Sequence, residues 1–527
     1  MDTRRLLRAS AALLASATLL LTSCSTGDDD TSESRSPTST KPGDPDAPLL
    51  KPLPAKVPGD LRPYYSQKLR WRSCGSGGFQ CAKLRVPLDY EKPGGEDLRL
   101  SVVRKRAEDS DRRIGSLQIN PGGPGGSAVD YVQTAAAPGY PDEIRARFDL
   151  VGMDPRGVAR SEPVECLSDR KMDDFTQVDQ TPDDDKEVSR LEKAYRQFAQ
   201  GCRQRTGDRL DHVSTTEAAR DMDVLRSALG DRELNYVGAS YGTLLGATYA
   251  GLFPQRSGRL VLDGAMDPSL SAERLNRDQT AGFNTAFTAF AKDCVKHRDC
   301  PLGTKDVKDA GARLAQLFRK VDADPLPTGD RRPLTESLAT TGVIRAMYDE
   351  SSWSMLREAL TDARKGDGAA LLRLADDYSE RDPDGSYSNL LFANPAVNCL
   401  DLPASFSDPR DLRKSLPSFK KASPVFGESF AWAALNCTYW KAEPTGKAHR
   451  IQAKGADPIV VVGTTRDPAT PYNWAEGLAG QLDSASLLTY EGDGHTAYGR
   501  GSSCIDSAIN SYLLEGKAPE DGKRCSS

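Results

Sequence analysis

The stretch LNYVGASYGTLLGATYA, residues 234–250, decides the fold class. An apolar run of strand type stops at a Gly-Ala-Ser-Tyr-Gly turn around Ser240 and then continues as small and apolar residues at helical spacing. G-x-S-x-G between a strand and a helix is typical of a nucleophile elbow, which exposes the serine hydroxyl at the edge of a sheet. The following helix N-terminus favours developing negative charge there. The pattern predicts that Ser240 is a nucleophile, and a purely structural turn is the alternative.

Short apolar runs that alternate with helical patterns extend from about residue 60 on both sides of this turn. Such alternation is typical of an α/β fold with a mostly parallel central sheet. Several runs end in Gly or Asp, where the carboxyl end of a strand meets a loop and where ligand sites of such sheets lie. The runs predict strands at 98–105, 115–123, 148–154, 234–240, 258–264, 457–463 and 485–492.

A long helical segment separates the strand expected at 258–264 from the one at 457–463. It carries patterns such as WSMLREALTDARKGDGAALLRLADDY and no convincing buried strand. Because sheet-like strands resume after it, we interpret the segment as a helical cap inserted late in the sheet rather than as an independent domain in tandem. The predicted folded parts are a first core part at 59–268, the cap at 269–450 and a second core part at 451–527.

Four histidines could activate the serine, which needs a general base: His212, His297, His449 and His495. In folds with this elbow the order along the chain is serine, acid, histidine, which leaves His449 and His495. His449 lies in the polar stretch GKAHRIQAKG, which is typical of a surface position. His495 lies in YEGDGHTAYG, a glycine-rich loop directly after the last expected strand. We predict His495 as the base, with a surface loop residue as the alternative.

The acid of the triad is expected just after the preceding strand. Asp467 in PIVVVGTTRDPATP stands there, 28 residues before His495. It would fix the imidazole tautomer and stabilise the imidazolium; a turn Asp before proline is the alternative. Asp493 lies only two residues from His495, and Asp263, which ends an earlier strand, is expected to be structural. The predicted catalytic residues are therefore Ser240, Asp467 and His495.

The stretch INPGGPGGSA follows another expected strand and holds four glycines between residues 122 and 126. Glycine lets backbone N–H groups approach a substrate oxygen closely. We predict an oxyanion hole in which one donor is Gly123 and the other is the N–H of Tyr241, the residue after the nucleophile. A phosphate-binding loop is the competing interpretation, but no Lys-Ser/Thr pair follows the glycines.

The bulk composition fits a soluble globular protein with some linker content. The chain has 527 residues, of which 38% are hydrophobic and 28% charged, and a formal net charge of −5. This balance lacks the basic footprint of a nucleic-acid-binding protein, so we expect no nucleic-acid partner.

The N-terminus has the features of an export signal. Three arginines precede a short apolar stretch at 9–22, which ends in LTSC at Cys24. LTSC resembles the lipobox of bacterial lipoproteins, in which Cys24 would be lipidated; an ordinary signal peptide with a chance cysteine is the alternative. Residues 24–58 are rich in Ser, Thr, Asp and Pro and are expected to be a flexible linker. With residues 1–23 as signal peptide, the protein is expected to be exported and either anchored to the cell membrane by lipid or extracellular.

Ten cysteines remain after Cys24, and an even number in an exported chain favours disulfides. The chain contains no C-x-x-C and only four histidines, so we expect five disulfides and no metal site. Their connectivity stays open among many possibilities, of which sequential pairing would close only local loops. The candidates are Cys74, Cys81, Cys166, Cys202, Cys294, Cys300, Cys399, Cys437, Cys504 and Cys525.

The motifs NPGGPGG, DPRGVARSEP, GASYGT, TTRDPATP and GDGHTAYG, in this order, resemble the secreted tripeptidyl aminopeptidases of actinobacteria. These enzymes are relatives of the proline iminopeptidases within the α/β-hydrolase fold. The resemblance runs from about residue 60 to the C-terminus. It implies a serine exopeptidase that removes short peptides from free N-termini without a cofactor, and a helical insertion that covers the active site.

Two positions depart from the pattern of the relatives. Proline iminopeptidases have His-Gly-Gly-Pro-Gly where this chain has NPGGPG from Asn120, which argues against specificity for a single proline. Ala159 stands in place of the second glycine of D-x-R-G-x-G-x-S, a mild change.

An aminopeptidase must also bind a cationic α-amine, which is costly to take out of water without a partner. A carboxylate in the cap, at a fixed distance from the nucleophile, would supply that partner. Asp401 in NPAVNCLD is the first candidate, because a disulfide between Cys399 and Cys437 would hold it rigidly. Glu350 in MYDESSW is the second. For Asp401 a helix-capping or surface position is the alternative.

Two other functions use the same fold. A carboxylesterase or lipase would have the same triad, and we keep it as the alternative. A non-catalytic binding protein would usually lack a member of the triad, and none is missing here.

Overall fold

The computed structural model describes residues 43–526 of the chain. In this part a ten-stranded sheet has the order β1-β2-β3-β5-β4-β6-β7-β8-β9-β10. The pairs from β5 to β10 are parallel, whereas β1, β2, β3 and β5 pair antiparallel. The strands are β1 (Arg72–Ser73), β2 (Phe79–Pro87), β3 (Asp97–Lys105), β4 (Gly115–Asn120), β5 (Phe148–Met153), β6 (Leu234–Ala239), β7 (Ser257–Asp263), β8 (Ile459–Arg466), β9 (Ala485–Asp493) and β10 (Lys523–Ser526).

The predicted α/β fold with a mostly parallel sheet is confirmed, and each expected strand is present within a few residues. Strands β1, β2 and β10 at the two edges were not expected. β2 has the sequence FQCAKLRVP, whose Lys and Arg side chains are exposed. An antiparallel strand with one solvated face lacks the continuous apolar run that marked the central strands.

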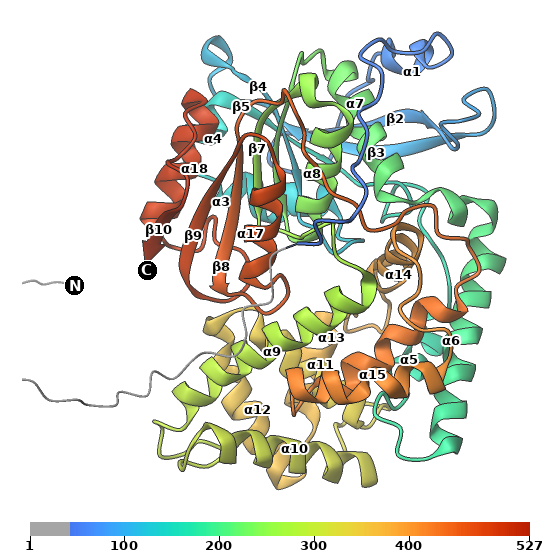
Figure 1. Cartoon of the computed structure of the whole chain (residues 1–527), viewed down its shortest axis with the longest axis vertical. Helices are drawn as coiled ribbons and strands as arrows, with labels where there is room; N and C mark the ends of the chain where they lie inside the picture. The colour runs from blue at the N-terminus through green and yellow to red at the C-terminus, as the bar shows by residue number, and fades with distance from the viewer. Residues whose placement is uncertain (1–42, 527) are drawn as a thin grey trace, which may run out of the picture. The chain divides into compact units, whose positions relative to one another are not determined.

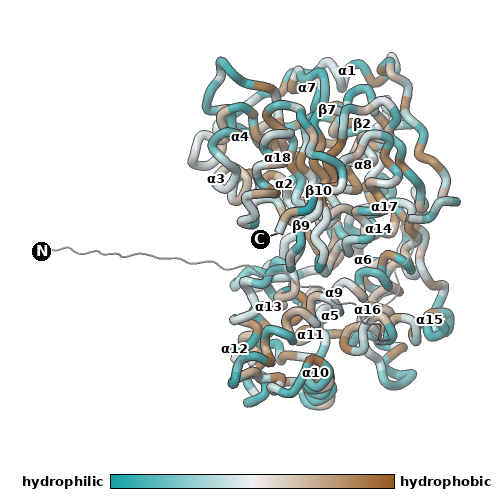
Figure 2. The backbone as a smooth tube through the Cα atoms, turned by 60° about the vertical axis from the view of Figure 1, so that its left-hand side comes forward, coloured by the Kyte–Doolittle hydropathy of each residue, from teal (hydrophilic) through white to brown (hydrophobic). Residues whose placement is uncertain are grey.

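Helices cover both faces of the sheet (Figure 1). Along β7, Leu260 and Leu262 pack in the same core as Leu245, whereas Val261 points to a second core with Ile509. Figure 2 shows hydrophobic stretches gathered in the middle of the sheet. The first face is covered by α7 (Thr215–Leu229), α8 (Tyr241–Leu252) and α17 (Tyr472–Gln481), and the second by α2 (Ala128–Tyr131), α4 (Asp142–Arg147) and α18 (Ser503–Glu515); α1 (Arg62–Tyr65) and α3 (Ala137–Gly139) are short.

The segment between β7 and β8 is a helical cap, as predicted. Its helices have a separate hydrophobic core that includes Phe283, Phe287, Phe290 and Leu314. The cap lies below the sheet in Figure 1. Its helices are α9 (Ala272–Cys294), α10 (Val307–Ala323), α11 (Glu336–Met347), α12 (Trp353–Lys365), α13 (Ala369–Tyr378), α14 (Leu390–Asp401), α15 (Pro409–Ala422) and α16 (Gly427–Ala433).

The cap also receives helices from a second insertion, which sequence analysis assigned to the core. Helices α5 (Asp169–Thr176) and α6 (Asp185–Thr206) follow β5. Tyr195 of α6 shares a hydrophobic cluster with Phe419 and Trp432 of the cap, and α6 runs beside the cap helices in Figure 1. The sequence of an amphipathic helix does not show which surface the helix covers. The prediction therefore placed α5 and α6 in the first core part, 59–268, although they pack on the cap.

Residues 43–58 correct the predicted linker at 24–58. They lie against the core instead of forming a free tether, and the rest of the predicted linker, 24–42, is outside the described residues. The N–H of Leu50 donates to the carbonyl of Arg450 at 2.9 Å, and that of Leu53 donates to Leu252 at 2.9 Å. These bonds satisfy backbone groups that an apolar Pro- and Leu-containing stretch would otherwise leave unpaired on the surface.

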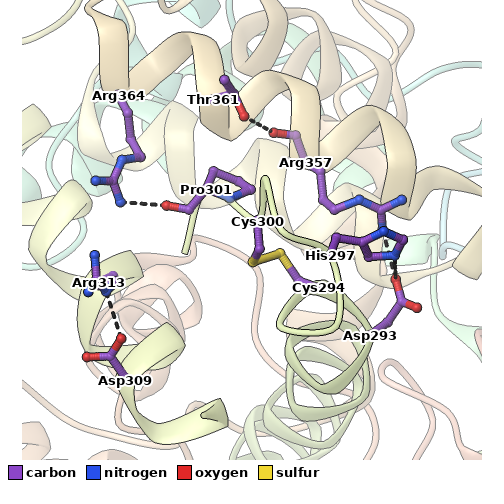
Figure 3. Close-up of a disulfide and its surroundings, with 10 residues drawn as sticks. All are labelled: Asp293, Cys294, His297, Cys300, Pro301, Asp309, Arg313, Arg357, Thr361 and Arg364. Atoms are coloured by element: carbon purple, nitrogen blue, oxygen red, sulfur yellow. Dashed lines mark hydrogen bonds and ion pairs between the residues drawn. A yellow bond between two sulfur atoms is a disulfide. The ribbon is translucent and has the colours of Figure 1, made fainter. Parts of the chain in front are cut away.

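All ten cysteines of the described residues form five disulfides, as predicted, and they pair sequentially: Cys74–Cys81, Cys166–Cys202, Cys294–Cys300, Cys399–Cys437 and Cys504–Cys525. Figure 3 shows that Cys294–Cys300 closes the turn after α9. Beside it, Arg357 of α12 donates to Asp293 at 2.8 Å. The disulfide and this ion pair together hold the end of α9 against α12. Within residues 43–526 no helix has the length and hydropathy needed to cross a bilayer.

Candidate active site

The turn around Ser240 has the geometry of a nucleophile elbow. β6 ends at Ala239, α8 begins at Tyr241, and Ser240 between them has φ 57° and ψ −125°, which L residues rarely adopt. A Cβ on Gly238 would lie 2.4 Å from the carbonyl oxygen of Gly242. This contact would force the turn apart, so the sharp turn requires glycine before the serine.

A histidine and a buried carboxylate meet at the carboxyl edge of the sheet. Nδ1 of His495 lies 2.9 Å from both carboxylate oxygens of Asp467. The Asp467 side chain is buried, and it also accepts the backbone N–H groups of Ala469 at 2.9 Å and Thr470 at 2.8 Å. Because Nδ1 carries the proton toward the carboxylate, Nε2 is left with a lone pair and can act as a base.

The end of β7 joins the elbow to the histidine loop. The N–H of Ser240 donates to the carbonyl of Asp263 at 2.8 Å. The Asp263 carboxylate accepts the N–H of Ala497 at 3.0 Å and that of Tyr498 at 2.8 Å, and burial raises its pKa. A Cβ on the next residue, Gly264, would lie 3.3 Å from Cε1 of His495. Asp263 thus holds the loop in place, which is the structural role expected for it.

The rival candidates for the base and the acid have other partners. Nδ1 of His449 lies 2.8 Å from the carbonyl of Lys447. Asp493 forms a bidentate ion pair with Arg466, with both distances at 2.7 Å. The structure brings Ser240, Asp467 and His495 to one edge of the sheet. Asp493 ends β9 at the same edge, but its carboxylate is paired with Arg466 and not with His495.

The glycine loop after β4 packs directly on the elbow. Gly122 and Gly123 have φ angles of 95° and 115°, which L side chains rarely adopt. A Cβ on Gly122 would lie 2.5 Å from the carbonyl of Ala239 and 3.1 Å from the backbone nitrogen of Tyr241. The loop that carries Gly123 and the N-terminus of α8 are therefore in contact, as two halves of an oxyanion hole require.

A cavity of about 580 Å³ opens between the glycine loop and the cap. Its wall includes Gly123 from the core, Tyr348, Glu380 and Leu390 from the cap, and Tyr195 from α6. This volume is in the range of small-ligand sites. The cap thus forms most of the wall of this cavity, which reaches the core at the glycine loop, and the second insertion contributes to it.

Tyr348 connects the cap to the histidine. The N–H of His495 donates to the carbonyl of Tyr348 at 2.9 Å, and the two rings meet edge to face with centroids 5.4 Å apart. Nη1 of Arg500 donates to the carbonyl of His495 at 2.5 Å, and its Nη2 lies 3.4 Å from the carboxylate of Asp349. These contacts fix the position of the histidine loop under the cap.

The two carboxylates predicted to bind the substrate amine do not line this cavity. The carboxylate of Asp401 accepts the N–H of Thr215 at 2.9 Å and also the Thr215 hydroxyl, behind the elbow. Burial raises the pKa of Asp401 to about 6. Glu350 is exposed in a separate groove beside Arg500. A position near the end of the cap does not determine the direction of the side chain, so the sequence could not place either carboxylate relative to this cavity.

Two other carboxylates do line the cavity, and sequence analysis did not find them. Asp377 forms an ion pair with Arg345. Glu380 accepts the hydroxyl of Ser388, and no ion pair with an Arg or Lys of the described residues joins it. Glu380 has φ 49°, an uncommon conformation for a residue other than glycine. That conformation leaves no mark in the sequence YSERDPDG, although turn residues cluster there.

Two groups of side chains in residues 43–526 have the spacing of metal ligands. Neither group contains Ser240, Asp467 or His495. The first group is Asp89, His212 and Glu217, and the second is Asp179, Asp322 and Glu336. In the first group the hydrogen bond to Glu217 raises the pKa of His212.

Comparisons with known proteins agree with this geometry. A family model described as TAP-like protein matches residues 423–525, which include Asp467 and His495. The chain is 38% identical to Serine protease Hip1 of Mycobacterium tuberculosis, over 88% of this chain and 92% of that protein. It is 39% identical to Carboxylesterase B of Mycobacterium tuberculosis, over 90% and 93% of the two chains. It is 31% identical to Tripeptidyl aminopeptidase of Streptomyces lividans, over 86% of each.

Proposed function

The chain belongs to the tripeptidyl aminopeptidase family of α/β-hydrolase serine peptidases, and from this premise we propose that it is an exported aminopeptidase that releases short peptides, tripeptides in particular, from free N-termini. The observation that carries the proposal is the hydrogen bond between Asp467 and His495, at the carboxyl edge that also holds the Ser240 elbow. The walled cavity that reaches the glycine loop at Gly123 supports an exopeptidase, because its size limits how much of a peptide can be bound there.

The reaction proceeds through an acyl-enzyme. Nε2 of His495 takes the proton of the Ser240 hydroxyl while its oxygen attacks the carbonyl carbon of the scissile bond. His495 then gives the proton to the leaving amine, and the remaining polypeptide departs. Water, deprotonated by the same nitrogen, hydrolyses the ester and regenerates Ser240. Asp467 holds the imidazole tautomer and stabilises the imidazolium in both steps.

The oxyanion that forms in each step is stabilised by backbone N–H groups. The donors are those of Gly123 and Tyr241, from the two loops that meet at Gly122. Donors fixed before the reaction stabilise developing charge without reorganising, and the loss of one such donor costs about 10²–10³ in kcat.

The α-ammonium of the substrate is bound by Glu380. A cation that leaves water requires a compensating charge, and Glu380 is the cavity carboxylate without an ion-pair partner in the described residues. Asp377 is already compensated by Arg345. The Ser388 hydroxyl holds one Glu380 oxygen and leaves the other for the ammonium. The distance from this carboxylate to the glycine loop would then set the length of the released peptide.

A panel of chromogenic substrates tests the proposal. Each tripeptide is assayed with a free and with an acetylated N-terminus, beside di- and tetrapeptides and a short-chain ester. We expect rapid turnover of the free tripeptide and little of its acetylated form. Equal turnover of both forms would contradict an aminopeptidase.

Carboxylesterase activity is the second candidate function, favoured by the relative of that name. The same triad cleaves esters, and most of the cavity wall is apolar side chains such as Phe175, Phe198 and Leu391. Preference for the ester over every free-amine peptide in the panel would select this function. A non-catalytic binding protein of the same fold is the remaining possibility, and absence of turnover on all substrates would select it.

Export rests on the signal-like residues 1–23 and on the five disulfides of the described part. Disulfides persist in oxidising compartments. Cys24 would carry the lipid of a membrane anchor; it lies outside the described residues. The protein would then act on peptides at the cell surface, with no cofactor and no nucleic acid.

A further inference from the structure

Helix α14 of the cap contacts both loops that carry the proposed oxyanion donors. Near its N-terminal end, a Cβ on Gly125 would lie only 3.1 Å from the carbonyl oxygen of Leu390. The residue before the helix, Asn389, accepts the N–H of Ala159 at 2.7 Å through its side chain. This end of α14 is therefore packed on the glycine loop and hydrogen-bonded to the core.

The other end of α14 reaches the residue after the nucleophile. Oδ1 of Asp401, the last residue of the helix, accepts the N–H of Thr215 at 2.9 Å, and Oδ2 accepts the Thr215 hydroxyl. The Thr215 hydroxyl is in turn 2.5 Å from the hydroxyl of Tyr241. Thr215 is the first residue of α7 and Tyr241 the first of α8. A chain of three side chains thus links the cap to the start of the nucleophile helix.

Counting protons fixes the direction of this chain. The Thr215 hydroxyl has one proton, which it donates to the Asp401 carboxylate, so toward Tyr241 it can only accept. The Tyr241 hydroxyl is therefore the donor at that contact. Asp401 also places a negative charge at the N-terminus of α7, where the helix dipole favours it. Each polar hydrogen in this series of three hydrogen-bonded side chains has one partner, which makes the arrangement rigid.

The cap holds Asp401 firmly from its own side. The disulfide Cys399–Cys437 joins α14 to the following segment. The N–H of Gly446 donates to the carbonyl of Leu400 at 2.9 Å, and a Cβ on Gly446 would lie 2.4 Å from the carbonyl oxygen of Asp401. The backbone at Gly446 thus packs against the main chain of Asp401 and fixes the end of α14 that carries the carboxylate.

We propose that Asp401 and Thr215 are positioning residues that fix Tyr241, and with it the oxyanion-hole N–H at the start of α8. The role rests on the proposed function of Ser240 as the nucleophile. This positioning role, and not binding of the substrate amine, would then explain the carboxylate of Asp401 at the end of α14. The geometry of the oxyanion hole would also depend on how α14 packs against the core.

The test compares Thr215→Val, which keeps the side-chain shape but removes the hydroxyl, with Thr215→Ser, which keeps the hydroxyl. The substrates are a free-amine tripeptide p-nitroanilide and p-nitrophenyl butyrate. Because both pass through an oxyanion, we expect Thr215→Val to lower kcat on both by about 10- to 100-fold, below the full loss of a donor. KM should stay within about twofold, since ground-state binding is unaffected.

Thr215→Ser should restore kcat to within about threefold of wild type, which a purely steric role of the residue would not predict. Tyr241→Phe removes the same chain from the other end and keeps the backbone N–H. It should match Thr215→Val, and the double variant should lose no more than either single one, because all three break one linkage. Thr216→Val, at the exposed next position on the same turn, is the matched control and should behave as wild type.

Wild-type kcat in Thr215→Val would overturn the proposal, and so would an increase in KM confined to the free-amine peptide. If Thr215→Val fails to fold, Tyr241→Phe decides by the same criteria. The proposed function fails separately, if wild-type protein shows no reaction of Ser240 with a fluorophosphonate probe.

Discussion

Replacing Glu380 by Gln removes the negative charge from the cavity carboxylate and keeps its size and its capacity to accept the Ser388 hydroxyl. A hydrogen bond between charged groups contributes about 1.5–3 kcal/mol. Glu380 is exposed at the cavity wall, so solvent screening reduces this contribution to about 1 kcal/mol. A loss of about 1 kcal/mol corresponds to roughly a fivefold weaker interaction. We therefore expect KM for a free-amine tripeptide to rise about fivefold in Glu380→Gln.

The assay is steady-state hydrolysis of a tripeptide p-nitroanilide, with p-nitrophenyl butyrate as the substrate that has no amine. Ester hydrolysis should be unchanged. KM of wild type should also rise above about pH 8, where a peptide α-amine loses its proton, and Glu380→Gln should lose most of that dependence. Glu350→Gln, an exposed carboxylate in the separate groove, is the control. An unchanged KM in Glu380→Gln, or equal losses on the peptide and the ester, would refute amine binding by Glu380.

Three further predictions concern the acid, the pH dependence of stability and the membrane anchor. Asp467→Asn should lower kcat by about 10⁴-fold on the tripeptide and the ester while circular dichroism shows a folded protein, because the wrong imidazole tautomer is stabilised; activity near wild type would assign the acid to another residue. Burial, together with Asp322 and Asp179, raises the pKa of Glu336 to about 7. The folded state therefore binds a proton at Glu336 more tightly than the unfolded state does. The stability that this group contributes at acid pH is lost as the pH rises from about 4.5 to 7. Glu336→Gln should accordingly raise Tm relative to wild type at pH 8 but not at pH 4.5. An equal change in Tm at both pH values would contradict a raised pKa of Glu336 in the folded protein. Cys24→Ala should move the protein from the membrane fraction to the medium or leave its signal uncleaved, whereas unchanged fractionation and a mature N-terminus without lipid would argue against the anchor.

Local signals in the sequence were sufficient for the elbow and for the residues beside it. Ser240 lies between a strand pattern and a helix pattern, and Asp467 and His495 each follow an apolar strand. Parallel strands bring their carboxyl ends to one edge, so the order of strands and loops implied that these three would meet. The glycine loop at 122–126 could be predicted in the same way, because its proposed role depends on backbone N–H groups and not on the direction of side chains.

The sequence contains no comparable signal for where the residues of the cap lie in the folded protein. Asp401 and Glu350 lie on cap segments whose patterns predict helix but not the surface that each helix covers. The left-handed conformation of Glu380 depends on contacts that are far apart in the sequence. Helix α6 packs on the cap although it precedes the elbow. Residues that line the cavity therefore come from two insertions, and sequence order alone could not bring them together.

The central claim is that Ser240 is the nucleophile of a peptidase that acts on free N-termini. The most direct measurement is tripeptide release from a free-amine polypeptide by wild type and by Ser240→Ala, together with mass-spectrometric mapping of a fluorophosphonate label. The account predicts a label on Ser240 in wild type, no label in the variant, and a loss of turnover of about 10⁶-fold, as for other triad serines. Tripeptide release by Ser240→Ala at the wild-type rate would contradict it.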